Sequence, residues 1–158
     1  MSTAKKTTRT TKSTTSTRST SGFSEAEKAA MKERAAEVRA SGKGGKRKAD
    51  DLEAVLAKIS EMSQPDRGLA ERIHSIVTSV APELDPKTWY GMPAYCRDGK
   101  AIIFFKPASK FGNRYSNLGF NDGARLDDGS MWPTEYAITT LTDADAAKIE
   151  ALVRKAAG

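Results

Sequence analysis

The sequence lacks several residue types and patterns, and each absence excludes a class of protein. Its 158 residues include one cysteine, Cys96, and one histidine, His74. A single cysteine excludes an intramolecular disulfide and a multi-cysteine metal site, which fits a reducing compartment. No apolar run is long enough to span a membrane, and the N-terminus has no apolar segment of the kind found in secretory signals. We therefore expect a soluble, cytoplasmic protein.

Acidic residues are absent from positions 1–22, which contain nine threonines, five serines, three lysines and two arginines. Such a segment buries too little apolar surface to offset chain entropy, so we expect it to be disordered. Residues 1–48 contain 13 lysines and arginines against four glutamates, whereas residues 49–158 contain 13 against 16 acidic residues. The pattern indicates a basic arm on a mildly acidic domain. The arm is a solubilising tail, a weak contact with nucleic acid or another anionic surface, or a target of phosphorylation.

The first two helices are predicted from capping residues at their N-termini. Ser24 and Glu27 form a capping-box pair that predicts a helix to about residue 40, and a flexible basic linker follows up to residue 49. Asp50 and Glu53 repeat the capping pattern at the start of a second helix. We expect this second helix to bury one apolar face, made of Leu52, Val55, Leu56 and Ile59.

The remaining periodicity predicts the rest of the fold. Apolar residues recur at helical spacing over 66–80 and again after Thr142, which is a typical N-cap residue. Two strands are expected over 115–120 and 137–141, with a polar turn or short helix between them. We therefore predict one α+β domain over residues 50–157, in which helices pack against an antiparallel sheet. The extra helix within 23–49 and the disordered basic tail precede this domain.

The strongest turn signal is Asp98-Gly99, because both central residues of a type I′ turn need a positive φ. A two-residue loop at this point pairs Cys96 with Ala101, Tyr95 with Ile102, and Pro93 with Phe104. Tyr95 and Phe104 would then share one face of the hairpin. Both faces are apolar, which predicts that the hairpin is covered on both sides or lines a cavity.

Few residues suggest catalysis. His74 has no partner at metal-ligand spacing and is interpreted as a residue at the edge of the core. Cys96 lies inside a strand and is interpreted as a small buried hydrophobe, although Arg97 and Lys100 could favour its thiolate. No acid–base pair, triad or cofactor loop is evident locally, so we expect a protein that is not an enzyme.

Aromatic residues crowd into the middle of the domain and have two interpretations. They could simply form the core of the sheet. Alternatively they could line a cleft for a small molecule or a partner protein, because several lie close to turns. The predicted cleft consists of Trp89, Tyr90, Met92, Tyr95, Phe104, Lys106, Phe120 and Trp132. Interleaved basic and aromatic residues over 106–115 are also typical of single-strand nucleic-acid platforms, but the negative charge of the domain argues against that use.

Acidic residues form two groups that could bind a metal ion. One is Asp50, Asp51 and Glu53, at a helix start, and the other is Asp122, Asp127 and Asp128, in one loop. Hard cations prefer such oxygen ligands. Helix capping in the first group and turn chemistry in the second would equally explain these residues.

An ordered set of motifs resembles a known family. The motifs are Trp89-Tyr90-Gly91-Met92-Pro93-Ala94-Tyr95, Asp98-Gly99-Lys100, Leu118-Gly119-Phe120 and the segment from Leu126 to Thr134. Together they resemble the YdhG-like domain of bacterial proteins, which is often grouped with the frataxin-like superfamily. The resemblance implies a small α+β fold, and some members are described as intracellular iron chaperones.

Two functions are therefore expected from the sequence. The resemblance implies weak, reversible binding of iron(II) through surface carboxylates, and delivery to a partner that assembles iron–sulfur clusters or haem. The alternative is a module that binds a small molecule or partner protein in the aromatic cleft, with residues 1–48 contacting nucleic acid. The resemblance carries over no set of catalytic residues.

Overall fold

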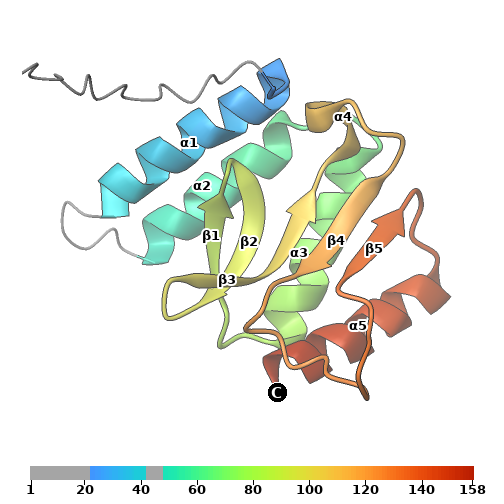
Figure 1. The fold of residues 1–158 in the computed structure, drawn as a ribbon. Coiled ribbons are helices and arrows are strands. Elements are labelled where there is room, and N and C mark those ends of the chain that lie inside the picture. Colours follow the sequence, from blue (N-terminus) through green and yellow to red (C-terminus); the bar gives the residue numbers. More distant parts are fainter. Residues whose placement is uncertain (1–21, 42–47) are drawn as a thin grey trace, which may run out of the picture.

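In the part of the chain that the structure describes, five antiparallel strands form a single sheet in which each strand pairs with the next one along the chain (Figure 1). The structure is a computed structural model, and it describes residues 22–41 and 48–158. The strands are β1 (Asp85–Trp89), β2 (Met92–Arg97), β3 (Lys100–Lys106), β4 (Ser116–Phe120) and β5 (Glu135–Ile138). The antiparallel sheet and its helices confirm the predicted α+β fold.

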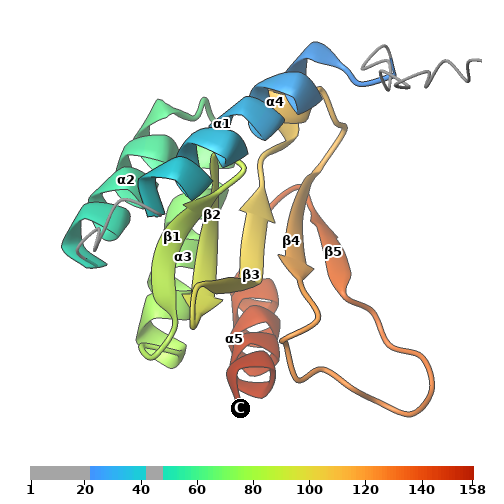
Figure 2. The same cartoon turned by 60° about the vertical axis from the view of Figure 1, so that its left-hand side comes forward.

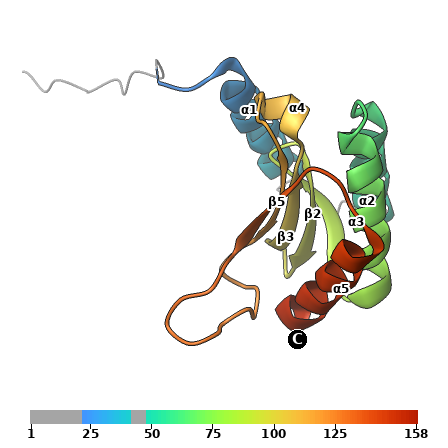
Figure 3. The same ribbon diagram turned by 90° about the vertical axis from the view of Figure 1, so that its right-hand side faces the viewer.

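The helices lie on both sides of this sheet (Figure 3). They are α1 (Glu25–Ser41), α2 (Lys48–Glu61), α3 (Asp66–Val80), α4 (Ala108–Phe111) and α5 (Asp143–Ala157). Helices α2, α3 and α5 cover one face, whereas α1 and the short α4 lie on the other side, beside the β1–β2 turn (Figure 2). No helix among the described residues is long and apolar enough to cross a membrane.

The core fills the space between the sheet and the layer of three helices. Its fully buried members include Ile73 and Val77 from α3, Ile103 and Phe105 from β3, and Leu118 from β4. The helical stripe predicted over 66–80 therefore packs against the sheet as expected. The stripe predicted on α2 is only half correct, since Val55 and Ile59 are buried but Leu52 and Leu56 are 36% and 46% exposed.

The helix starts test the predicted caps directly. Ser24 and Glu27 exchange both hydrogen bonds of a capping box, with N···O distances of 2.7 and 3.1 Å. Thr142 caps α5 in the same way, with Asp145 as its partner. The cap predicted at Asp50 and Glu53 is wrong, because α2 begins two residues earlier, at Lys48, and Asp50 lies inside its first turn.

The hairpin between β2 and β3 has the predicted turn but a different register. Asp98 and Gly99 have φ angles of 51° and 75°, as a type I′ turn requires. An irregularity between Tyr95 and Cys96 then shifts the ladder by one residue, so that Tyr95 pairs with Ile103. Tyr95 therefore faces the core, while Phe104 lies on the opposite face. The predicted shared face is wrong, because both faces of this hairpin are apolar and the pattern alone does not reveal the bulge.

Two elements were missing from the sequence prediction. Strand β1 pairs with β2 through a tight Tyr90-Gly91 turn, in which both residues have positive φ angles of 53° and 71°. Tyrosine is uncommon at a position with a positive φ, so the sequence does not indicate a hairpin turn at this point. Helix α4 is a single turn. Its position is fixed by the buried carboxylate of Asp66, which accepts hydrogen bonds from Ser109 and Ser116.

Further predictions fall outside the described residues or need a smaller correction. The disorder expected for 1–22 and the flexible linker expected for 42–49 concern residues that lie almost entirely outside the described ranges, although Lys48 begins α2. The last strand ends at Ile138 instead of Leu141. Residues 121–134 contain turns and no helix.

Candidate functional site

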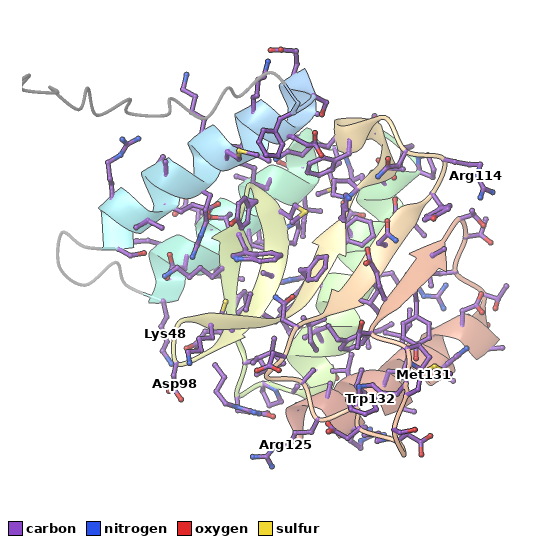
Figure 4. The ribbon with its side chains drawn as sticks, in the orientation of Figure 1. Lys48, Asp98, Arg114, Arg125, Met131 and Trp132 are labelled. Carbon is purple, nitrogen blue, oxygen red and sulfur yellow. The ribbon has the colours of Figure 1, made fainter. Side chains whose placement is uncertain are left out.

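The residues of the predicted cleft lie in three separate places. Five of them line one cavity of about 330 Å³, which we call the aromatic groove. The groove is lined by Glu27, Ala30, Met31, Trp89, Tyr90, Met92, Phe104, Lys106, Phe111 and Glu135. Tyr95 is fully buried in the core on the other face of the sheet. Phe120 and Trp132 line a different cavity beside the loop that precedes β5, and Figure 4 shows Trp132 in that loop.

The floor of the groove is set by the pairing of three strands. Phe104 pairs with Gly119, and Gly119 pairs with Glu135, so all three share the face of the sheet opposite the core. The ring of Phe104 lies over Gly119 so closely that a Cβ at that position would overlap it. A glycine in β4 therefore lets this ring lie flat along the sheet.

Two further rings extend this floor toward β1. The ring centroids of Trp89 and Phe104 are 5.1 Å apart and those of Trp89 and Tyr90 are 4.9 Å apart, which are ordinary distances for aromatic pairs. All three side chains are only half-buried. The floor of the groove is thus a set of rings with part of their surface accessible to a ligand.

Helix α1 supplies the facing wall and is held by polar contacts. The carboxylate of Glu37 accepts hydrogen bonds from the backbone N–H groups of Tyr90 and Gly91, at 3.1 and 2.9 Å. The guanidinium carbon of Arg34 lies 5.7 Å from the centroid of the Tyr90 ring. These contacts tie one helix face to the β1–β2 turn, and Ala30 is buried as a result.

A second carboxylate of α1 joins three helices. Glu33 forms ion pairs with Lys58 of α2 at 3.0 Å and with Lys110 of α4 at 2.5 Å. Burial opposes ionisation of Glu33, but the hydrogen bonds from Lys110 and Lys58 outweigh it and lower the pKa of this carboxyl. The pair lies against the β1–β2 turn, where a Cβ at Gly91 would overlap both Glu33 and Lys110. Glycine is therefore required at position 91 by its φ and by this close approach.

The acidic residues proposed as metal ligands do not form a comparable site. Asp50, Asp51 and Glu53 lie in the first turns of α2, and Asp122, Asp127 and Asp128 lie in the loop after β4. Asp122 and Asp127 line the cavity that contains Trp132. Across residues 22–41 and 48–158, no three His, Cys, Asp or Glu side chains gather in a way that could hold a metal ion.

The single histidine and cysteine also lie outside the groove. The Nδ1 atom of His74 is 3.1 Å from the hydroxyl of Tyr95, and burial lowers the pKa of His74. Burial raises the pKa of the Cys96 thiol to about 11, which disfavours the thiolate that a nucleophile needs. The charges of Lys87 and Arg34 lower this pKa, but by less than burial raises it.

Sequence reasoning missed the wall of the groove that α1 contributes, together with Phe111 and Glu135. The capping pair at Ser24 predicts the helix but not what it packs against, and no local signal connects residues 27–31 with a sheet that begins at Asp85. Comparison with protein-family models, curated proteins and solved structures finds no match for this chain. The resemblance to the YdhG-like domain stays a prediction.

Proposed function

We propose that this protein is a non-enzymatic binding module whose site is the aromatic groove. The observation that carries the proposal is the set of half-buried rings, Trp89, Tyr90 and Phe104, which line a cavity of about 330 Å³. Ligand sites are typically concave, mostly apolar and of roughly 300–1,000 Å³, with a few polar groups that orient the ligand. The groove has this composition, because Glu27, Lys106 and Glu135 are its charged members.

Burial of apolar surface favours an apolar group as the occupant of the groove. Transfer of apolar surface from water is favourable by about 25 cal/mol per Å², and a ligand covering these rings would remove surface on both partners from water. Tyr95 shows the contrast, because its ring is already fully buried and has no surface left to offer. The lining consists mostly of aromatic rings, thioethers and a methyl group. Such groups suit van der Waals contact with a ligand and do not transfer protons.

Iron carriage has less support in the geometry. The chemistry expected of an iron chaperone needs several oxygen ligands close together. The described part of the chain places the two acidic groups on α2 and on the loop after β4, without a cluster of three. Iron binding therefore stays a prediction of the family resemblance.

The two tryptophans provide a test of the proposed site. Trp89 lines the aromatic groove, whereas Trp132 lines the other cavity, and each gives its own indole N–H signal in a ¹H–¹⁵N correlation spectrum. Titration of the full chain with flat apolar probes, beginning with indole, should shift the Trp89 signal and leave Trp132 in place. A shift at Trp132 alone, or at neither tryptophan, would overturn the proposed site.

A matched pair of variants on α1 sharpens the test. Met31 lines the groove and is 41% exposed, so Met31→Lys places a charge at its mouth without disturbing the core. Val38 lies two turns further along the same helix, is 54% exposed and does not line the groove. Met31→Lys should weaken probe binding, whereas Val38→Lys should not. Equal effects of the two variants would show that the probe binds elsewhere.

A further inference from the structure

A second cavity continues the aromatic groove along the same face of the sheet. It has a volume of about 420 Å³ and a polar lining of Lys106, Asn113, Arg114, Tyr115, Asn117 and Glu135. We call it the polar cavity. Lys106 and Glu135 line both cavities, so a molecule in one would lie beside the other. The two cavities are therefore adjacent, one with a mostly apolar lining and the other with a polar lining.

The cations of the polar cavity lie beside aromatic rings and form no ion pair with a described residue. The Nζ atom of Lys106 lies 4.9 Å from the centroid of the Phe111 ring, and the guanidinium carbon of Arg114 lies 5.1 Å from that of Tyr115. No carboxylate of a described residue lies within ion-pair distance of either cation. Lys58 and Lys110 differ, because both are paired with Glu33. Lys106 and Arg114 therefore keep their capacity to bind an anion.

Two carboxylates also face this region and limit what can bind. Glu27 is occupied by the capping box, and hydrogen bonding to Ser24, with a smaller effect from the charge of Lys106, lowers its pKa. Glu135 lies at the junction of the two cavities, and no side-chain partner for it is found within 22–41 and 48–158. It can accept an N–H or O–H from the body of a ligand.

We propose that the ligand is a small organic anion, with a flat apolar body and a carboxylate or phosphate at one end. The body would cover the rings of Trp89 and Phe104 in the aromatic groove. The anionic group would lie in the polar cavity, where Lys106 and Arg114 supply N–H donors and positive charge. This inference rests on the proposed function, since it assigns the chemical class of the molecule that the aromatic groove takes.

Probes that share one ring and differ in charge test the assignment. Indole-3-acetate and 3-indoxyl phosphate are anionic, indole-3-acetamide is neutral and tryptamine is cationic. Followed by the Trp89 indole N–H of the full chain, an anion should bind roughly fivefold more tightly than the acetamide, since each exposed ion pair contributes little. Tryptamine should bind most weakly. Comparison of the two anions then shows whether the site prefers carboxylate or phosphate.

Substitutions in the polar cavity test whether Lys106 and Arg114 themselves attract the anion, or whether any change in the net charge of the protein has the same effect. Lys106→Met and Arg114→Gln should each reduce the advantage of the anions, whereas Lys100→Met is the control, because Lys100 begins the same strand outside both cavities. Lys106→Arg should restore most of the advantage, and higher salt should weaken it.

The results distinguish this inference from the proposed function. Equal binding of anionic, neutral and cationic indoles would overturn the assignment to anions, while binding in the aromatic groove would stand. An anion preference that persists in both Lys106→Met and Arg114→Gln would also overturn it. Failure of every indole to shift the Trp89 signal would overturn the proposed function itself.

Discussion

At the residue scale, the pair formed by His74 and Tyr95 shows how the core accommodates a buried hydroxyl. Tyr95 is fully buried, so its hydroxyl must find a partner within the protein. The ring of His74 provides that partner from α3, at 3.1 Å. Burial raises the pKa of Tyr95 and lowers that of His74, so both groups are neutral at pH 7. The sequence placed His74 at the edge of the core but did not indicate its partner.

The lowered pKa of His74 makes stability depend on pH. The unfolded chain binds a proton near pH 6.5, whereas the folded protein binds it only at a lower pH. The free energy of unfolding should therefore fall as the pH drops below about 6.5, until the pKa of the folded state is reached. Urea denaturation between pH 7.5 and 5 measures this. The variant His74→Gln should lose that part of the pH dependence, and identical profiles for the two proteins would contradict the prediction.

At the element scale, α1 is attached to the sheet mainly through the β1–β2 turn. Glu37 binds the two amides of that turn, and the pair between Glu33 and Lys110 packs against Gly91. These contacts connect residues more than 50 positions apart, so no local pattern predicts them. Helices with clear caps, such as α1 and α5, could be predicted well because the capping residues are neighbours in sequence. The register of β2 could not be predicted, because both faces of this strand are apolar and its bulge therefore does not change the sequence pattern.

The substitution Gly91→Ala should loosen α1 without unfolding the core. A methyl group there would overlap Glu33 and Lys110, and alanine is also strained at a φ of 71°. We expect a loss of about 1–3 kcal/mol in the free energy of unfolding. Hydrogen exchange of the Tyr90 amide should accelerate, because Glu37 would no longer hold it.

Gly99→Ala is the control for this experiment. Gly99 has a similar φ of 75°, but no atom lies within 4 Å of the point that a methyl group would occupy, so this variant measures backbone strain alone. Equal destabilisation by the two substitutions, with no faster exchange at Tyr90, would show that Gly91 does not support α1.

At the scale of the whole molecule, one core lies between the sheet and the layer formed by α2, α3 and α5 (Figure 3). Periodicity identified most of its helical members, because each helix buries one stripe. The aromatic groove lies outside this core, on the opposite face of the sheet, and is assembled from α1, α4 and four strands. Its residues between Trp89 and Lys106 could be proposed from sequence, whereas Phe111, Glu135 and the α1 wall are brought to the groove by long-range contacts.

Two leucines test the position of the core. Leu118 is fully buried in β4, whereas Leu56 is 46% exposed on α2, although the sequence pattern placed it on a buried stripe. Leu118→Ala should lower the free energy of unfolding by about 2–5 kcal/mol, the usual cost of such a cavity. Leu56→Ala should change it by about 0.5 kcal/mol or less. Chemical denaturation of both variants measures the difference. Similar losses in the free energy of unfolding would contradict this position of the core.

The position of α1 has a practical consequence for anyone preparing a shortened version of this protein. Every member of the main core cluster lies at Val55 or later, so a truncation starting at Lys48 keeps that cluster and the complete sheet. It removes Glu27, Ala30 and Met31, and with them one side of the ligand site. Such a truncated protein would be expected to give a native-like spectrum and yet bind poorly, so a negative screen on it would say nothing about the full chain.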